Sequence, residues 1–315
     1  MNIQWSDRSR SIRVVFVASM ALLIVLNLYT FTVAYPETSK LDSGIGSGPV
    51  LAKDFSAYYI GAWRLFHDPS KVYVHGYVDD GEYQVYPQPE AYKYLPSFLA
   101  IVSPILYLGY QQALITFDIF QFALLPLMAL LLYKLLSKKG LALTFVVAVI
   151  VLLQPSPLPH WGISASYFWQ WGEGQAKVFE TFLFLLAFYL GDSNRPYLSG
   201  IVFALAAFDP RFGLLSLPLF IWYNRNKLKA SVESMLGALI VSNLALLYPG
   251  TGSAFLNMAF GSGAATPLYY YAFIPLLTII SLIVVNGKEM VVALYHSISR
   301  IACSPITNRN TDSSP

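Results

Sequence analysis

The chain has 315 residues, of which 56% are hydrophobic and only 12% are charged, with 20 Lys and Arg against 17 Asp and Glu. Soluble globular proteins carry about 25% charged residues, so this chain has too few charges to cover a water-facing surface. The composition excludes a soluble enzyme, a nucleic-acid-binding protein and a disordered scaffold, and it predicts an integral membrane protein.

Long apolar runs predict an all-α, polytopic membrane protein with about eight or nine transmembrane helices. The first run is too long for the apolar core of a cleavable signal peptide, so we expect it to remain as a transmembrane helix. Several other runs are shorter than the roughly 20 residues of a full crossing, and we expect them to extend into their flanks or to be shielded by neighbouring helices. Residues 1–303 then form one integral membrane domain, and the polar tail 304–315 is expected to be disordered. The predicted spans are 12–35, 112–134, 141–153, 175–191, 197–208, 213–223, 230–248 and 268–285.

Clusters of Lys and Arg beside the spans predict their orientation, because cytoplasmic loops are enriched in these residues. Placing all the clusters in the cytoplasm gives a multi-pass protein of the cell membrane with a cytoplasmic N-terminus. The loops 36–96, 154–174, 209–212 and 249–266 then lie on the outer, extracytoplasmic face. The clusters are Arg8, Arg10 and Arg13; Lys134, Lys138 and Lys139; and Arg225, Lys227 and Lys229.

This orientation requires both ends of the region 36–111 to lie outside, so it depends on whether the short apolar stretch 97–109 crosses the membrane. It is only about a dozen residues long and contains Pro104, which is typical of a re-entrant or interfacial helix, so we favour a segment that does not cross. In the alternative it crosses the membrane, and the cluster of Lys138 and Lys139 then violates the charge rule.

The long outer loop 36–96 is rich in acidic residues and tyrosines, and a loop of this length indicates a function. Its stretch 54–67 predicts an amphipathic helix that lies on the membrane surface and ends before Pro69. Asp54 at its start is either an N-cap or a general base at the lipid–water boundary, and the two roles do not exclude each other. The apolar positions at helical spacing are Phe55, Tyr58, Tyr59, Ala62 and Phe66.

A second outer loop, 154–177, is rich in tryptophan, which is typical of the interfacial belt of a membrane protein. Aromatic side chains also line sugar sites, and the sequence does not separate these interpretations. His160 is a lone loop histidine, a pattern that favours a structural role over a ligand. The run Gly172-Glu173-Gly174-Gln175, with Lys177 after it, opens an apolar helix and predicts a close backbone approach beside polar groups.

Asp209-Pro210-Arg211 separates two apolar segments and is either a simple Asp–Arg turn at the outer surface or the site of a phosphate-binding arginine. The second interpretation rests on the guanidinium group, which matches phosphate oxygens in a bidentate way. Polar residues within the spans are expected to face the interior of the bundle, because charges at membrane depth are costly. These residues are Asn27, Asp118, Gln121 and Asn243.

We expect no metal site and no cofactor. The acidic run 79–82 is typical of a solvated turn, and the one cysteine excludes a cysteine-rich metal site. Neither a dinucleotide-binding glycine motif nor a P-loop is present, so a donor substrate must be reached from the membrane.

Four short motifs, taken in order, resemble glycosyltransferase family 87, a family of membrane enzymes with the GT-C fold that includes polyprenyl-phosphate-mannose-dependent α-1,2-mannosyltransferases. They are DFSAYY at 54–59, Tyr94-Leu95-Pro96, Gly174-Gln175 and Asp209-Pro210, and the resemblance covers roughly residues 12–223. The chain departs from the family pattern at Leu95, where a first proline is typical, at Ala176, and at Asp209, where the family has a lysine. The chain is also short for the family.

The resemblance implies a GT-C-like bundle with an extracytoplasmic first loop, and an inverting, metal-independent sugar transfer on the outer face. A polyprenyl-phosphate-linked hexose, such as mannose, would be the donor, and a lipid or glycan hydroxyl would be the acceptor. Asp54 would be the catalytic base, and Arg211, with Lys177, would stabilise the departing phosphate. The candidate substrate-binding residues are Tyr58, Tyr59, Tyr94, His160, Glu173, Gln175, Lys177 and Arg211.

Two other function classes stay open. The lysine replaced by Asp209 and the short C-terminal part would also suit a lipid- or glycolipid-binding membrane protein that kept the fold and lost activity. A small-solute transporter predicts polar residues near the membrane midplane on several helices, whereas this sequence concentrates them in outer loops and shows no internal repeat. The enzyme is favoured if Asp54 and Arg211 face one common cavity, and the catalytic interpretation fails if they lie on different faces.

Overall fold

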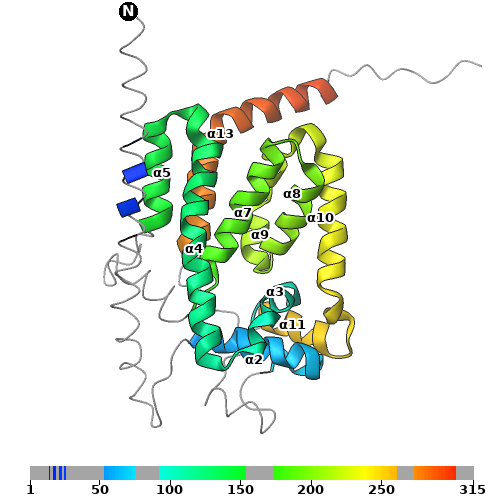
Figure 1. Cartoon of the computed structure of the whole chain (residues 1–315). Helices are drawn as coiled ribbons and strands as arrows, with labels where there is room; N and C mark the ends of the chain where they lie inside the picture. Colours follow the sequence, from blue (N-terminus) through cyan, green and yellow to red (C-terminus); the bar gives the residue numbers. More distant parts are fainter. Residues whose placement is uncertain are drawn as a thin grey trace, which may run out of the picture.

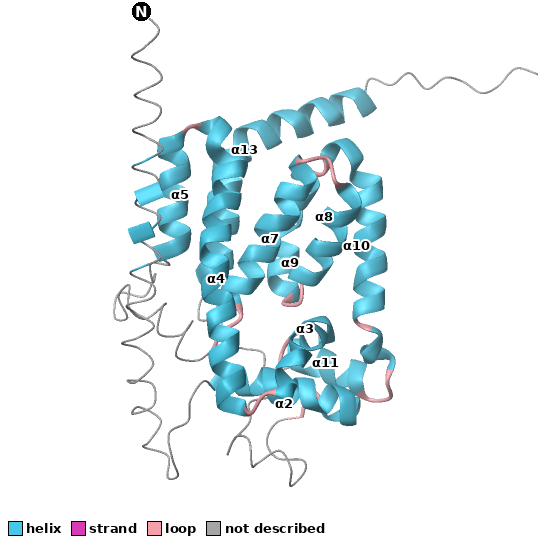
Figure 2. Cartoon of the chain, in the orientation of Figure 1, coloured by secondary structure: helices cyan, strands magenta, loops and turns pink. Residues whose placement is uncertain are grey.

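The computed structural model describes residues 53–74, 92–153, 174–260 and 273–302, together with six single positions between Val14 and Val25. All regular structure in these ranges is helical, which confirms the predicted all-α class (Figure 2). Apart from the six helical positions, the first predicted span lies outside the described residues, as does the tail 304–315.

Two helices are long and apolar enough to cross a membrane, judged by length and composition within the described residues. The first is α4 (Tyr110–Leu136), and the second is the part Pro275–Ala293 of α13 (Phe273–Ala302). In Figure 1, α4 runs along the whole height of the bundle, with α5 and part of α13 beside it. The other helices of the bundle are α5 (Leu141–Leu153), α7 (Lys177–Asp192), α8 (Pro196–Ala206), α9 (Pro210–Tyr223) and α10 (Leu228–Ser242).

These other helices lie within or close to the predicted spans, but they are too short for a full crossing. At 1.5 Å per residue, the 16 residues of α7 and the 11 of α8 rise about 24 and 16 Å, against roughly 30 Å of hydrocarbon. Proline begins both α8 and α9, a position where its missing N–H has no partner within the helix. A total of eight or nine crossings therefore stays a prediction.

A second group of helices lies across one end of the bundle (Figure 1). It consists of α2 (Lys53–His67), α3 (Pro96–Val102), the 3₁₀-helix Ser103–Tyr107, and α11 (Thr251–Phe260). Thr251 ties α11 to this group, because its hydroxyl donates a hydrogen bond of 3.0 Å to the Pro69 carbonyl.

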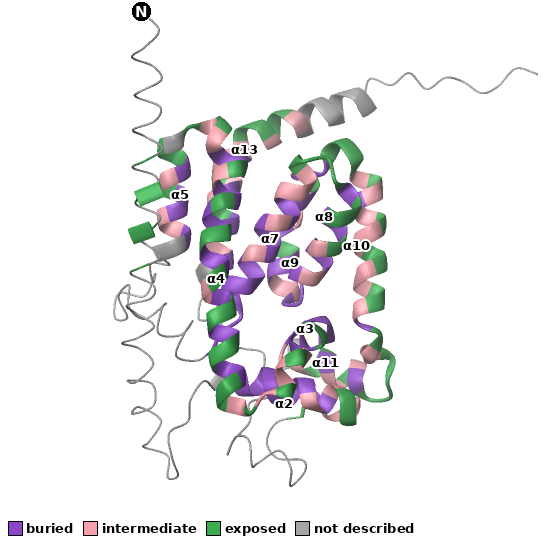
Figure 3. Ribbon diagram, in the orientation of Figure 1, coloured by how far each residue is buried: buried purple, intermediate pink, exposed green. Residues whose placement is uncertain are grey.

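The predicted helix at 54–67 is present as α2, and it ends at His67, just before Pro69. Its burial differs from the prediction, because residues 55–62 are buried on every side (Figure 3). Phe55 packs against Phe117 of α4, and Phe66, expected on the apolar face, is exposed. The first half of α2 is therefore an internal element that packs against α3 and α4, rather than a helix lying on a surface.

The stretch 97–109 forms α3 and the short 3₁₀-helix that follows it, and both pack against α2. Their 12 residues, Pro96–Tyr107, are one of the shorter apolar helical segments and extend at most about 18–24 Å. That length suits the non-crossing segment that we favour from the sequence.

Candidate active site

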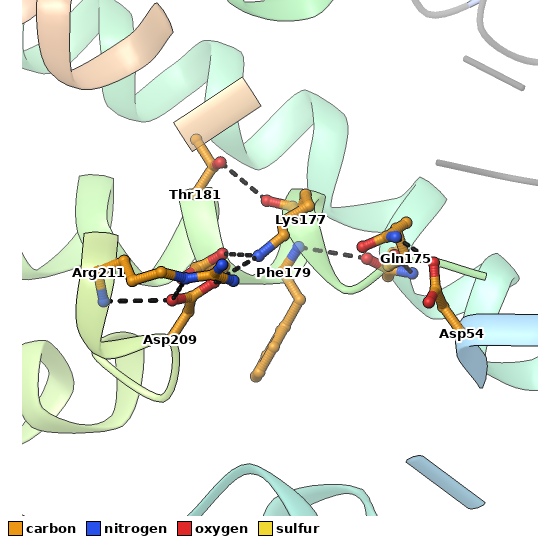
Figure 4. A network of polar contacts seen from close by, with 9 residues as sticks. Asp54, Gln175, Lys177, Phe179, Thr181, Asp209 and Arg211 are labelled. Atoms are coloured by element: carbon orange, nitrogen blue, oxygen red, sulfur yellow. Dashed lines mark hydrogen bonds and ion pairs between the residues drawn. The ribbon is translucent and has the colours of Figure 1, made fainter. Parts of the chain in front are cut away.

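Asp54 lies in the first turn of α2, which begins at Lys53, so it is not the N-cap residue of the simpler interpretation. A carboxylate in the first turn is still favoured by the partial positive charge of the helix N-terminus. The side chain of Asp54 is half-buried, and its Oδ2 accepts a hydrogen bond from Nε2 of Gln175, 121 residues along the chain (Figure 4).

Gln175 is placed by the turn that leads into α7. Gly174 has a φ of +65°, in the left-handed region that glycine adopts without strain. The close backbone approach expected here from the sequence stays a prediction. The backbone carbonyl of Gln175 accepts a hydrogen bond of 2.9 Å from Nε2 of Gln121. Gln121 is fully buried on α4 and so confirms the prediction that it faces the bundle interior.

Lys177 is buried at the start of α7, where its ammonium group contacts two carboxylates. Nζ lies 3.1 Å from Oδ2 of Asp209 and 3.0 Å from Oε2 of Glu180. It also lies 4.9 Å from the centroids of the Tyr94 and Phe212 rings, within the range of cation–π attraction. Sequence reasoning missed Glu180, although a Lys and a Glu three residues apart in an apolar helix are a recognisable signal.

Asp209 caps α9 and holds Arg211 in a bidentate ion pair. Its Oδ1 accepts from the backbone N–H of Arg211 at 3.2 Å and from Nε at 2.9 Å, and its Oδ2 accepts from a terminal nitrogen at 2.8 Å. The predicted Asp–Arg turn is therefore present. Burial opposes ionisation of Asp209, but the Lys177 ammonium and the Arg211 guanidinium hold the pKa of its carboxyl below the usual range. Where the family pattern has a lysine, this chain has an aspartate that contacts a lysine from α7.

Tyr94, whose ring lies 4.9 Å from the Lys177 ammonium, packs next to Tyr58, with the two ring centroids 6.1 Å apart. Burial raises the pKa of the Tyr94 hydroxyl to about 12, so the group is a phenol at neutral pH. Burial, with Tyr94 and Asp54 nearby, also holds the pKa of Tyr58 well above its usual range. The Tyr94 hydroxyl also interacts electrostatically with four charged side chains, those of Lys177, Asp209, Asp54 and Arg211.

The backbone around Tyr94 is fixed by hydrogen bonds from distant parts of the chain. Its carbonyl accepts from the Tyr73 hydroxyl at 2.9 Å, and the next N–H, of Leu95, donates to the Phe208 carbonyl at 2.8 Å. Oδ1 of Asn243 accepts from the N–H of Ser97 at 3.1 Å and so satisfies one of the first donors of α3. The segment 94–97 is therefore held by residues of the segments that follow α2, α8 and α10.

Not every candidate joins this cluster. The hydroxyl of Tyr59 donates to the Leu108 carbonyl at 2.8 Å, and its ring packs on Tyr110 instead of Tyr94.

Asp118 is buried within α4, as predicted, and its carboxylate accepts no hydrogen bond from any residue that the structure describes. His160 and Glu173 lie outside the described residues. Within the described ranges, no three His, Cys, Asp or Glu side chains gather as metal ligands would.

A helical bundle with apolar outer faces and a buried, charged cluster where several helix ends meet is the arrangement of a membrane protein with a polar site. The chain belongs to glycosyltransferase family 87, whose model matches residues 92–284, more than half of its length. No curated protein and no solved structure matches it significantly. Family membership makes the protein a glycosyltransferase that takes a sugar donor and an acceptor. The matched residues include Tyr94, Gln175 and Asp209, whereas Asp54 lies upstream of them.

Proposed function

We propose that this glycosyltransferase moves a hexose, such as mannose, from a polyprenyl-phosphate-linked donor to an acceptor hydroxyl at the outer face of the membrane, with inversion. The observation that carries the proposal is that two polar contacts meet at the start of α7: Gln175 binds Asp54, and Lys177 binds Asp209, which holds Arg211. Figure 4 shows the Asp54 carboxylate, which can accept a proton, and the Arg211 guanidinium, which can bind a phosphate, on opposite sides of this helix start. A common cavity between the two groups stays a prediction, and it would favour the enzyme over an inactive lipid-binding protein.

In the proposed reaction, Asp54 is the general base. The acceptor hydroxyl gives its proton to the Asp54 carboxylate as its oxygen forms a bond to the anomeric carbon. The bond from that carbon to the donor phosphate oxygen breaks at the same time, and the polyprenyl phosphate leaves with the bonding electron pair. The attack and the departure occur on opposite faces of the sugar, so the anomeric configuration inverts.

Arg211 is the proposed phosphate ligand, because its side chain is 34% exposed while the Asp209 side chain is fully buried. Asp209 uses Nε–H and one terminal N–H of the guanidinium, and the guanidinium carries further N–H donors for the oxygens of a phosphate. Lys177 is almost fully buried against Asp209 and Glu180, so we assign it an indirect part, in which it neutralises Asp209 and leaves Arg211 its positive charge.

The proposal is tested with purified protein, labelled polyprenyl-phosphate-mannose or -glucose, and a panel of mannoside and lipid-linked sugar acceptors. Asp54→Asn should lower the transfer rate by about 10²–10⁴-fold, because it removes the proton acceptor and keeps the shape of the side chain. Thermal stability should stay close to that of the wild type.

Asp68→Asn is the matched control, since Asp68 follows the other end of α2 and caps the short 3₁₀-helix after it. It removes the same charge just beyond the other end of α2 and should keep wild-type activity. Two results contradict the proposal: no transfer by the wild type from either lipid-linked hexose, or near-wild-type transfer by Asp54→Asn.

A further inference from the structure

Two buried glutamines connect α4 to the candidate base. Gln121 on α4 donates from Nε2 to the carbonyl of Gln175 at 2.9 Å, and its Oε1 accepts from the N–H of Phe179 at 3.4 Å. Both ends of one amide group therefore bind the backbone at the start of α7. Because Gln121 is on a 27-residue helix that packs against α7, this contact fixes the Gln175 turn relative to the longest rigid part of the site.

Gln175 then directs its own amide to Asp54. Its side chain is 3% exposed, and its Nε2 donates to Oδ2 of the Asp54 carboxylate. An amide nitrogen is a donor only, so this contact favours the ionised form of the carboxylate, which is the form that a general base requires. The contact also fixes the plane of the carboxylate, and it uses Oδ2 for a hydrogen bond within the protein.

We propose that Gln121 and Gln175 are positioning residues of the transfer reaction, which hold the Asp54 carboxylate ionised and correctly oriented toward the acceptor hydroxyl. This inference rests on the proposed function, since it requires Asp54 to be the base. The physical reason is that proton transfer needs a heavy-atom distance of about 2.6–3.2 Å, and a displacement of about 1 Å costs roughly 10²-fold in rate. Figure 4 shows the Gln175 side chain directed at the Asp54 carboxylate.

The test compares Gln175→Met, which removes the donor and keeps the length, with Gln175→Glu, which replaces the donor by a second carboxylate. We measure kcat, KM for the lipid-linked sugar, and the pH dependence of kcat/KM. Gln175→Met should lower kcat by about 10–100-fold with KM changed less than about threefold, and Gln175→Glu should lower kcat further. In both variants the acidic limb of the profile should move to higher pH, because the carboxylate loses a hydrogen bond to its charged form. Gln121→Met should act in the same direction with a smaller effect.

Asn286→Leu is the matched control for the loss of a buried amide. Asn286 is 3% exposed on α13 and donates to the Tyr223 hydroxyl at 3.2 Å, away from the site. It should lower thermal stability without moving the pH profile. If Gln175→Met only lowers stability, as this control does, and keeps the wild-type kcat and acidic limb, the positioning role is wrong while the base assignment stands. If the Asp54→Asn variant keeps wild-type activity, both the positioning role and the base assignment are wrong.

Discussion

Asp209 is the residue whose surroundings depart most from what a turn in an outer loop suggests. Its side chain is fully buried, yet it contacts two cations, Lys177 from α7 and Arg211 from its own turn. Breaking a buried ion pair by removing one partner is costly, because the other charge stays buried without compensation. At the residue scale, therefore, this carboxylate stabilises the fold as well as holding the proposed phosphate ligand.

The first prediction concerns Asp209→Asn. Since Lys177 and Arg211 hold the pKa of the folded-state carboxyl below its ordinary value of 3.8, the ionised group stabilises the fold above that pH. The contribution is lost as the pH falls through the lowered folded-state pKa. We expect Asp209→Asn to reduce the free energy of unfolding by about 3–5 kcal/mol at pH 7. The difference from the wild type should be constant from about pH 5 to 6 and should shrink below about pH 4.

Thermal unfolding in detergent at several pH values measures this difference. Asp192→Asn is the control, because Asp192 lies partly exposed at the other end of α7, 3.9 Å from Lys138, and should contribute little. An Asp209→Asn difference that is absent at pH 7, or that grows toward low pH, contradicts the assignment of a stabilising ionised carboxylate.

At the scale of elements, α8 and α10 approach closely because a glycine faces the contact. A Cβ placed on Gly200 would collide with the Ser231 carbonyl and the Ser234 hydroxyl, and it would lie 2.8 Å from the Met235 N–H. Small residues allow membrane helices to approach in this way, and the resulting van der Waals contact stabilises their association. This contact holds α8, and with it the Asp209 turn that follows α8, against α10.

The second prediction is that Gly200→Ala lowers the free energy of unfolding by about 1–3 kcal/mol, because the added methyl group has no space. Gly237 on α10 provides the opposite case, since a Cβ there meets no atom within 4 Å. Gly237→Ala should stabilise the protein by about 0.5–1 kcal/mol, through the higher helix propensity of alanine. Thermal unfolding of both variants in the same detergent measures the pair. Equal effects of the two substitutions would mean that the close approach of α8 and α10 does not matter for stability.

At the scale of the whole molecule, the charged residues separate toward the two ends of the bundle. Lys138 lies near Asp192, and Lys139 forms an ion pair with Glu289 of α13. Arg225 begins the next cationic cluster. It interacts electrostatically with the Tyr223 hydroxyl, as do Asp192 and Glu289, so these side chains lie near one another. Two clusters that are far apart in the sequence therefore lie at one end, whereas α2 and α3 lie at the other (Figure 1). The assignment of that end to the cytoplasmic face stays a prediction from the sequence.

The third prediction tests that orientation with single cysteines in a Cys303→Ser background, which removes the one native cysteine. Lys138 and Tyr107 suit the purpose, because their side chains are 81% and 94% exposed. A membrane-impermeant thiol reagent should label Tyr107→Cys in intact cells and Lys138→Cys only after permeabilisation. The reverse pattern would invert the topology, and labelling of both in intact cells would place the two ends on one side.

The local sequence determined the helices and most of their ends. The apolar run of α4, the proline that begins α9 and the glycine before Gln175 act within their own segments, so their consequences can be derived from the chain alone. The inward placement of Asp118 and Gln121 follows equally from the cost of a polar group in an apolar surrounding.

Only the tertiary structure decided which polar groups meet. Gln175 reaches Asp54 across 121 residues, and Lys177 reaches Asp209 across 32, and no local pattern encodes either pairing. The burial of α2 could not be predicted from the sequence either, because the spacing of its apolar residues fits a surface helix as well as an internal one. The physical reason is common to these cases: a buried charge or amide must find a partner, and the packing of distant helices determines which partner is within reach.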